Sequence, residues 1–310
     1  MKILLLGNTG QLGWELNRTL LTLGELTALD YPQINMVNPV SLKSIIKEHK
    51  PNLIINATAY TDVDKAESEP EKAMAINGTS PGVLAEEALK TGAALIHYST
   101  DYVFDGSKGE AYTEEDKPNP INIYGLSKLR GEQAVRQVGG AYLILRTAWV
   151  YSLRRPCFVT KVLEWARTQK VLRIVDDQIS SPTWARTLAE TTALVIAQGR
   201  NDPVGYISEK VGLFHLAGNG FISRLKWALM ILKLDPGRHE QKVKKILPDL
   251  TSNFPSPAQR PKYTALDCQN FIAAFGLYIP FWEASLYLAM NTPEDIASER
   301  KFHLRVTNGF

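Results

Sequence analysis

The sequence predicts an α/β protein with a doubly wound parallel sheet and a second, smaller mixed α/β domain. In the first half of the 310-residue chain, short aliphatic runs alternate with segments of helical spacing. A glycine-rich turn separates the first aliphatic run from the first helical segment, and after residue 175 the alternation becomes irregular. Strands that alternate with helices form a parallel sheet with helices on both faces.

The first strand and the turn after it indicate a nucleotide site. Residues 2–6 are an aliphatic run, and the turn Gly7-Asn8-Thr9-Gly10-Gln11-Leu12-Gly13 leads into a helical pattern that extends to Leu23. Strand, glycine turn and helix are the Rossmann-like context of a dinucleotide site. The glycines allow the backbone to approach a pyrophosphate, and the helix N-terminus supplies free N–H groups and a positive dipole end.

The second strand, predicted at residues 26–29, ends in Asp30. The distance in sequence from Gly13 to Asp30 is close to that expected for an acid that binds the adenine ribose hydroxyls. The alternative is a strand-end acid that faces water. No arginine follows Asp30 directly, which favours NADH, although NADPH stays open.

The alternation continues through the first half of the chain. A long helix at residues 70–91 contains a polar interruption, Asn77-Gly78-Thr79. An irregular segment at 104–122 precedes a helix that carries Tyr124. The other helices are predicted at residues 42–49 and 158–169, and the other strands at 53–57, 94–98, 142–145 and, as the sixth, 171–175.

These elements divide the chain into three parts. Residues 1–175 are predicted to form mainly an NAD(P)-binding domain, residues 176–292 mainly a lid for a second ligand with interleaved segments, and residues 293–310 a polar tail. Within the lid, short strands are predicted at 205–207 and 213–216 and helices at 184–197, 223–232 and 281–290.

The composition narrows the class of protein. The 35 basic and 32 acidic residues are too balanced to indicate nucleic-acid binding. No apolar stretch approaches the roughly 18 residues of a membrane span, and the N-terminal apolar run is too short for a signal peptide. The only cysteines, Cys157 and Cys268, are expected to be buried thiols. A cytoplasmic protein without a metal site is therefore expected.

Polar side chains gather at the carboxyl edge of the predicted sheet. Thr100 follows the fourth strand, and Tyr124 and Lys128 lie one turn apart on one face of the next helix. A nearby ammonium group lowers the pKa of a phenol, which is otherwise about 10. Tyr-x-x-x-Lys alone is more often a surface tyrosine beside a solvated lysine.

Together with a nicotinamide, these three groups suit carbonyl–alcohol chemistry. The cofactor gives a hydride to a carbonyl carbon, Tyr124 gives a proton to the developing alkoxide, and Thr100 forms a hydrogen bond with that oxygen. Lys128 adjusts the tyrosine pKa and binds the nicotinamide ribose.

Several sequence blocks make the combination specific. The glycine turn, Thr100 and Tyr124-x-x-x-Lys128 resemble the extended short-chain dehydrogenase/reductase superfamily, and the blocks over nearly the whole chain resemble the dTDP-4-dehydrorhamnose reductase family. The blocks are GNTGQLGWEL, DKAESEPE, STDYVFDG, NIYGLSKLRGE, RTAWVY and DDQISSPT.

The resemblance implies that NADPH or NADH reduces the C4 ketone of dTDP-6-deoxy-L-lyxo-4-hexulose, a dTDP-4-keto-6-deoxy sugar nucleotide, to dTDP-L-rhamnose. It implies substrate contacts from Thr100, Asp101 and Trp149. The expected cofactor contacts, with the turn included, are Gly7, Gly10, Gln11, Leu12, Gly13, Asp30, Asn35, Met36, Ala59, Tyr60, Thr61, Tyr98, Tyr124 and Lys128.

Two other functions stay open from the sequence. One is a non-catalytic, dinucleotide-binding regulatory subunit of the methionine adenosyltransferase type, and the other is a related sugar-nucleotide epimerase or dehydratase. Some relatives hold magnesium between subunits with glutamates. Glu15 and Glu283 match those positions, but Arg186 replaces a third acid, so no metal is predicted. A homodimer is among the expected assemblies.

Overall fold

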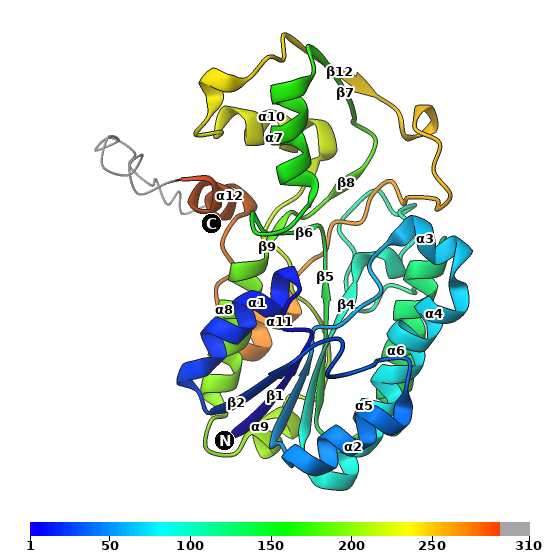
Figure 1. Cartoon of the computed structure of the whole chain (residues 1–310), viewed down its shortest axis with the longest axis vertical. Helices are drawn as coiled ribbons and strands as arrows, with labels where there is room; N and C mark the ends of the chain where they lie inside the picture. Colours follow the sequence, from blue (N-terminus) through cyan, green and yellow to red (C-terminus); the bar gives the residue numbers. More distant parts are fainter. Residues whose placement is uncertain (292–310) are drawn as a thin grey trace.

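The central element is a six-stranded parallel sheet in the order β10-β5-β4-β3-β1-β2 (Figure 1). We describe residues 1–291 of a computed structural model. The strands are β1 (Lys2–Leu6), β2 (Glu25–Leu29), β3 (Leu53–Asn56), β4 (Ala94–Thr100), β5 (Tyr142–Thr147) and β10 (Gly212–His215). The predicted doubly wound α/β fold is confirmed.

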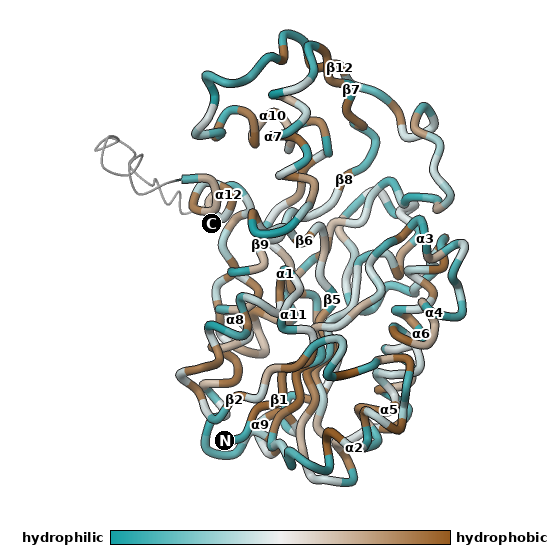
Figure 2. Tube along the Cα trace, in the orientation of Figure 1, coloured by the Kyte–Doolittle hydropathy of each residue, from teal (hydrophilic) through white to brown (hydrophobic). Residues whose placement is uncertain are grey.

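Helices cover both faces of this sheet because its strands are apolar on both faces. Successive side chains of a strand point to opposite sides. In β1, Ile3 and Leu5 pack with α1 (Gln11–Thr19), α8 (Ala185–Gln198) and α11 (Gln269–Phe275). Leu4 and Leu6 pack with α2 (Pro39–His49), α5 (Ser80–Thr91) and α6 (Ile123–Val138). The hydropathy colouring shows the apolar strands between the two helical layers (Figure 2).

The glycine turn brings α1 unusually close to β1. Gly7 has a φ of +90°, a conformation that favours glycine. A Cβ atom on Gly13 would lie 1.8 Å from the backbone oxygen of Gly7. Gly13 therefore serves helix–strand packing, and this packing fixes where the N-terminus of α1 points.

The predicted long helix contains a π-helical turn at its polar interruption. It consists of α4 (Pro70–Met74), the turn Ala75–Thr79 and α5. The amide of buried Asn77 accepts a hydrogen bond from the backbone N–H of Tyr60 at 2.8 Å and donates to its backbone oxygen at 3.0 Å. The side-chain nitrogen also donates to the Ser127 hydroxyl at 3.0 Å, so the π turn joins the segment after β3 to α6.

A second lobe lies beyond the carboxyl edge of the sheet, at the top of Figure 1. It contains α7 (Phe158–Thr168), α10 (Arg224–Lys233) and the parallel pair β7 (Val171–Val175) and β12 (Lys245–Asp249), which share one apolar core. The remaining α-helices and strands of the described residues are α3 (Val63–Ser68), α9 (Pro203–Glu209), α12 (Trp282–Met290), β6 (Val150–Tyr151), β8 (Ile179–Ser180), β9 (Thr183–Trp184) and β11 (Ile222–Ser223).

Two predicted strands are wrong in place or type. Residues 171–175 pair with β12 in the second lobe, and β10 is the sixth strand of the large sheet. Alternate burial of β7, with Val171 and Arg173 exposed, is typical of a half-covered strand and not of a central parallel one. Residues 205–207 belong to helix α9, because Asp202 caps the backbone N–H of Gly205 at 2.9 Å and Pro203 occupies the first turn.

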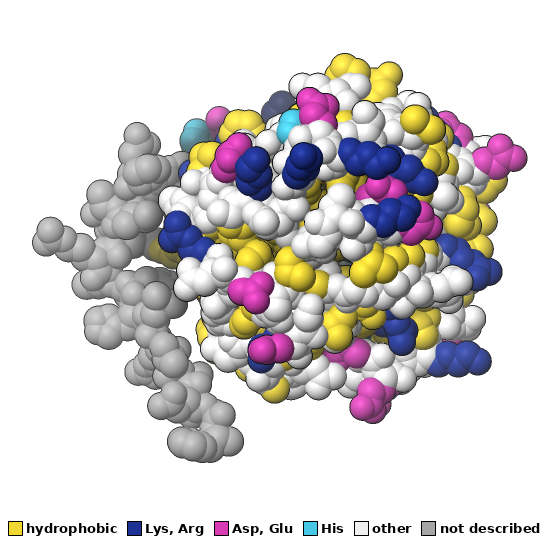
Figure 3. Space-filling model, turned by 90° about the horizontal axis from the view of Figure 1, so that it is seen from below, with side chains coloured by type: hydrophobic (Ala, Val, Ile, Leu, Met, Phe, Trp, Pro, Cys, Tyr) yellow, Lys and Arg dark blue, Asp and Glu magenta, His cyan; other side chains and the backbone are white. Residues whose placement is uncertain are grey.

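The chain thus crosses between the lobes more than once, and the domain limits 1–175 and 176–292 stay predictions. The predicted tail, 293–310, lies outside the described residues. Within residues 1–291, no helix is long and apolar enough to cross a membrane. On the face seen in Figure 3, basic side chains are interspersed with acidic and apolar ones.

We expect Gly13→Ala to lower the free energy of unfolding by about 1–3 kcal/mol, because the added methyl group collides with the backbone of the glycine turn at Gly7. Urea unfolding measures this change. Gly212→Ala is the control, since its Cβ atom would meet nothing closer than 3.5 Å. Equal unfolding midpoints for the two variants would contradict the packing role of Gly13.

Candidate active site

A cavity of about 1030 Å³ opens at the carboxyl edge of the large sheet, between the two lobes. It brings together all but two of the predicted site residues. Gly13 packs behind the turn, and Tyr60 is held by Asn77 and Glu69. The predicted residues that line the cavity are Gly7, Gly10, Gln11, Leu12, Asp30, Asn35, Met36, Ala59, Thr61, Tyr98, Thr100, Asp101, Tyr124, Lys128 and Trp149.

The glycine turn fits a dinucleotide. Gly10 precedes α1 with extended backbone and offers no capping side chain, so the first N–H groups of the helix have no local partner. The Oε1 atom of Gln11 is buried without a hydrogen-bond partner, although this residue lines the cavity. A bound dinucleotide would satisfy both kinds of group. Its pyrophosphate would accept from the free N–H groups, and one of its hydroxyls would donate to the Gln11 oxygen.

Asp30 is fixed at the end of β2 beside this turn. One oxygen of its carboxylate accepts hydrogen bonds from the backbone N–H and the hydroxyl of Thr9, at 3.0 and 2.6 Å. The other oxygen accepts from the backbone N–H of Tyr31 at 2.8 Å. Asp30 therefore also shapes the glycine turn, a role that the sequence spacing did not reveal. Its contact with the ribose stays a prediction.

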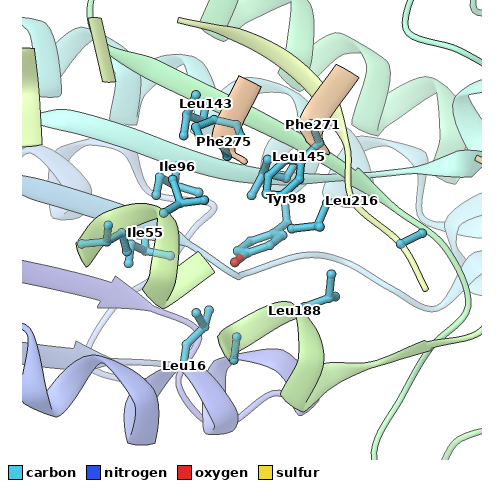
Figure 4. Close-up of a cluster of buried hydrophobic side chains, with 14 of the residues drawn as sticks. Leu16, Ile55, Ile96, Tyr98, Leu143, Leu145, Leu188, Leu216, Phe271 and Phe275 are labelled. Carbon is cyan, nitrogen blue, oxygen red and sulfur yellow. The ribbon is translucent and has the colours of Figure 1, made fainter. Parts of the chain in front are cut away.

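The side chain of Tyr98 lies in the hydrophobic core, and its predicted contact with the cofactor stays a prediction. Its ring points into the core among Leu16, Leu145 and Leu188 (Figure 4). Its hydroxyl is hydrogen-bonded to the Thr192 hydroxyl at 2.6 Å. The backbone oxygen of Tyr98 accepts a hydrogen bond from the ammonium group of Lys128 at 2.5 Å.

Tyr124 and Thr100 meet in the wall of the cavity. Asn122 caps α6 by accepting from the backbone N–H of Gly125 at 2.8 Å, which fixes the first turn that carries Tyr124. The side chain of Thr100 lies beside the phenol of Tyr124, and the ring of Tyr102 stands edge-on to that of Tyr124 at 5.8 Å between centroids.

Burial raises the pKa of the Tyr124 phenol, which keeps it protonated at neutral pH. The sequence-based expectation that Lys128 lowers this pKa is not met in the structure, because the ammonium group binds the Tyr98 backbone oxygen instead. A protonated phenol suits a group that must give a proton away.

Lys128 is itself buried, with 2% of its surface exposed. Burial lowers its pKa to about 8, and the nearby Glu132 carboxylate, one turn further along α6, acts in the opposite direction. Glu132 forms a buried ion pair with Arg146 of β5, through contacts of 2.7 and 2.9 Å, and accepts from the Ser99 hydroxyl at 2.5 Å. This network was not found from the sequence, since Glu132 and Arg146 lie in separate blocks.

Comparison with known proteins agrees with this geometry. The family described as RmlD substrate binding domain matches residues 1–294. A dTDP-4-dehydrorhamnose reductase of Burkholderia thailandensis is 39% identical over 94% of this chain and 98% of its own length. The chain belongs to the dTDP-4-dehydrorhamnose reductase family. This membership favours the reductase over the regulatory-subunit and epimerase readings.

Solved structures of family members have the same fold. A dTDP-4-dehydrorhamnose reductase of Clostridium acetobutylicum gives a TM-score of 0.85 at 34% identity, covering 96% of this chain and 100% of that one. A reductase of Bacillus anthracis in complex with NADP gives a TM-score of 0.81 at 32% identity, covering 92% and 96%.

In this family member, Asp101 connects the catalytic edge with the second lobe. Its buried carboxylate accepts hydrogen bonds from the hydroxyls of Thr264 and Thr100, at 2.5 and 3.1 Å, and of Ser180 at 3.1 Å. Burial raises the pKa of Asp101 to about 6. If Asp101 contacts the substrate as predicted, its carboxylate must do so while three hydroxyls also donate to it.

Trp149 lines the cavity in a left-handed conformation, with a φ of +38°. Further lining residues were missed from the sequence. Tyr102 lies within a recognised block, whereas Arg155 and Arg224 lie outside the blocks and gave no local signal. Arg260 forms an ion pair with Asp64 at 2.9 Å.

We expect Glu132→Gln to shift the basic limb of the pH profile of kcat/KM for reduction to lower pH, by about one unit or more. Glu132 raises the pKa of Lys128, so its loss lowers that pKa and Lys128 loses its proton at lower pH. Ser99→Ala is the control, because it removes a hydrogen bond to Glu132 and keeps the charge. A basic limb unchanged in Glu132→Gln would contradict this role.

Proposed function

We propose that this chain catalyses the NAD(P)H-dependent reduction of the C4 ketone of dTDP-6-deoxy-L-lyxo-4-hexulose to dTDP-L-rhamnose. The proposal is supported most directly by the single cavity that is lined by the glycine turn and by the neighbouring side chains of Tyr124 and Thr100. The substrate is inferred from the names of relatives that share the full length of the chain.

NAD(P)H, when bound at the glycine turn, would supply a hydride to the carbonyl carbon. Tyr124 donates its phenolic proton to the oxygen, which completes the alcohol. Thr100 stabilises the developing negative charge by turning its hydroxyl proton from Asp101, which accepts it at 3.1 Å in this structure, to the substrate oxygen. The Lys128 ammonium group, buried one helical turn away and bound to the Tyr98 backbone oxygen, would bind the nicotinamide ribose.

The glycine turn and Asp30 would hold the cofactor at the opposite side. Gly10, Gln11 and Leu12 present the N-terminus of α1 to the pyrophosphate. Asp30 is held rigidly enough to accept from a ribose hydroxyl. The cofactor is NADH or NADPH.

We also infer a cytoplasmic location, because both ligands are nucleotides. In addition, we infer that the chain forms a homodimer. The homodimer is supported by large apolar side chains that are exposed on three helices of one side of the molecule, Trp14 on α1, Leu194 on α8 and Leu288 on α12 (Figure 1). A mass of one 34.6 kDa chain by light scattering would contradict the homodimer.

The function is tested by following NAD(P)H absorbance with a panel of 4-keto-6-deoxy sugar nucleotides. We expect stoichiometric oxidation of NAD(P)H with the dTDP-linked L-lyxo sugar. An epimerase or dehydratase would consume no net NAD(P)H, and a regulatory subunit would bind the cofactor without turnover. Either result would contradict the proposal.

We expect Tyr124→Phe to reduce kcat about 10²- to 10⁴-fold, because the proton donor is lost. The dissociation constant for NADH should stay within a few-fold of that of the unchanged chain. Tyr142→Phe, on β5 outside the cavity, is the matched control and should keep full activity. A Tyr124→Phe variant that turns over at the normal rate would exclude this phenol as the acid.

A further inference from the structure

Arg224, the first residue of α10, reaches from the second lobe into the wall of the cavity. Its guanidinium lies 3.8 Å from the ring centre of Trp149 and 4.7 Å from that of Phe158. Its side chain also lies near the phenol of Tyr102, which lies beside Tyr124. The guanidinium is thus held by aromatic groups a short way from the catalytic phenol.

Within residues 1–291, Arg224 has no carboxylate at ion-pair distance. Arg146, Arg167 and Arg260, in contrast, each contact a carboxylate at 2.7 to 2.9 Å. Burial lowers the pKa of Arg224, and the neighbouring Arg260 adds repulsion, while Tyr102 and Asp101 act in the opposite direction. The Asp101 carboxylate is occupied by three hydroxyls and does not pair with Arg224.

Arg224 is half-buried, and a cation that is partly removed from water without a counter-ion costs free energy. Aromatic faces attract the guanidinium but carry no net charge, so they do not neutralise it. An anion that enters the cavity would neutralise the guanidinium. The phosphates of the cofactor belong at the N-terminus of α1 in the other lobe, which leaves the second ligand as the source of this anion.

We propose that Arg224 forms an anion subsite that binds the diphosphate of a nucleoside diphosphate sugar. This inference rests on the proposed function, since the sugar nucleotide carries a diphosphate between its sugar and its nucleoside. The planar guanidinium can donate two parallel hydrogen bonds to phosphate oxygens, and the rings of Trp149 and Phe158 fix its plane. The sugar then extends towards Thr100 and Tyr124.

The test compares the affinities of dTDP and thymidine for the full chain by calorimetry, with NADH present. We expect Arg224→Met to weaken dTDP binding about 10- to 100-fold and to leave the affinities for thymidine and NADH within a few-fold. Arg154→Met is the matched control. Its guanidinium also stacks on a tryptophan, Trp14 at 3.7 Å, but it is exposed and outside the cavity, so dTDP should bind normally.

Two results would overturn the subsite. An unchanged affinity for dTDP in Arg224→Met would show that Arg224 does not meet the diphosphate. Equal losses for thymidine and dTDP would show that Arg224 only supports the ring of Trp149.

Loss of NADH binding in Arg224→Met would indicate that the variant does not fold. In that case two further measurements test the subsite. Arg224→Lys keeps the charge and should keep more dTDP affinity than Arg224→Gln. The unchanged chain should bind dTDP at least tenfold more tightly than thymidine, with a difference that shrinks as salt increases. Equal affinities for the two ligands would overturn the subsite.

The same assay with UDP and GDP separates this inference from the proposed function. Binding of UDP or GDP that depends on Arg224, without binding of dTDP, would support the subsite and contradict the dTDP-linked substrate. Absence of binding of every nucleoside diphosphate would overturn the subsite. Turnover of the dTDP-linked ketone at a KM unaffected by Arg224→Met would overturn it and keep the proposed function.

Discussion

The buried ion pair between Glu132 and Arg146 determines how α6 sits on the sheet. Two charges inside a protein cost several kcal/mol each unless they are paired and their remaining hydrogen-bonding groups are satisfied. Here Arg146 contacts Glu132 through two nitrogens and approaches His215 at 3.5 Å. The Ser99 hydroxyl donates a further hydrogen bond to the Glu132 carboxylate. The pair joins α6 to β4 and β5, so the helix cannot slide without breaking it. Lys128 and Tyr124 lie on the same helix, so the ion pair also fixes their positions relative to the sheet.

Glycines make the same position possible by removing side chains where α6 meets its neighbours. A Cβ atom on Gly125 would lie 2.1 Å from the backbone oxygen of Tyr102, and one on Gly131 would lie 2.1 Å from that of Asn77. The first approach brings Tyr124 next to the segment that carries Thr100. The second presses α6 against the π turn. The distance between the phenol and the Thr100 hydroxyl is therefore a property of backbone packing, which is more rigid than a contact between side chains alone.

The sequence was informative where the signal is local. The glycine turn, the first five strands and the pair Tyr124 and Lys128 follow from short patterns, and the structure has each of them. The sixth strand could not be assigned, because β7 and β10 are both short apolar runs and their partners are distant in sequence. Arg224 was missed for the same reason, since it meets Trp149 only after the second lobe has folded over the cavity.

The carboxylate of Asp101 shows why the second lobe matters to the chemistry. Thr264 and Ser180 from the second half of the chain, and Thr100 at the end of β4, donate to the same two oxygens. With a pKa of about 6, Asp101 is ionised at neutral pH and is a strong acceptor for all three. The position of the lobe and the orientation of the Thr100 hydroxyl are therefore coupled through one group. A nucleotide that spans Arg224 and Thr100 would hold the lobes at the same junction, so binding energy from atoms far from the ketone would help to align it with Tyr124.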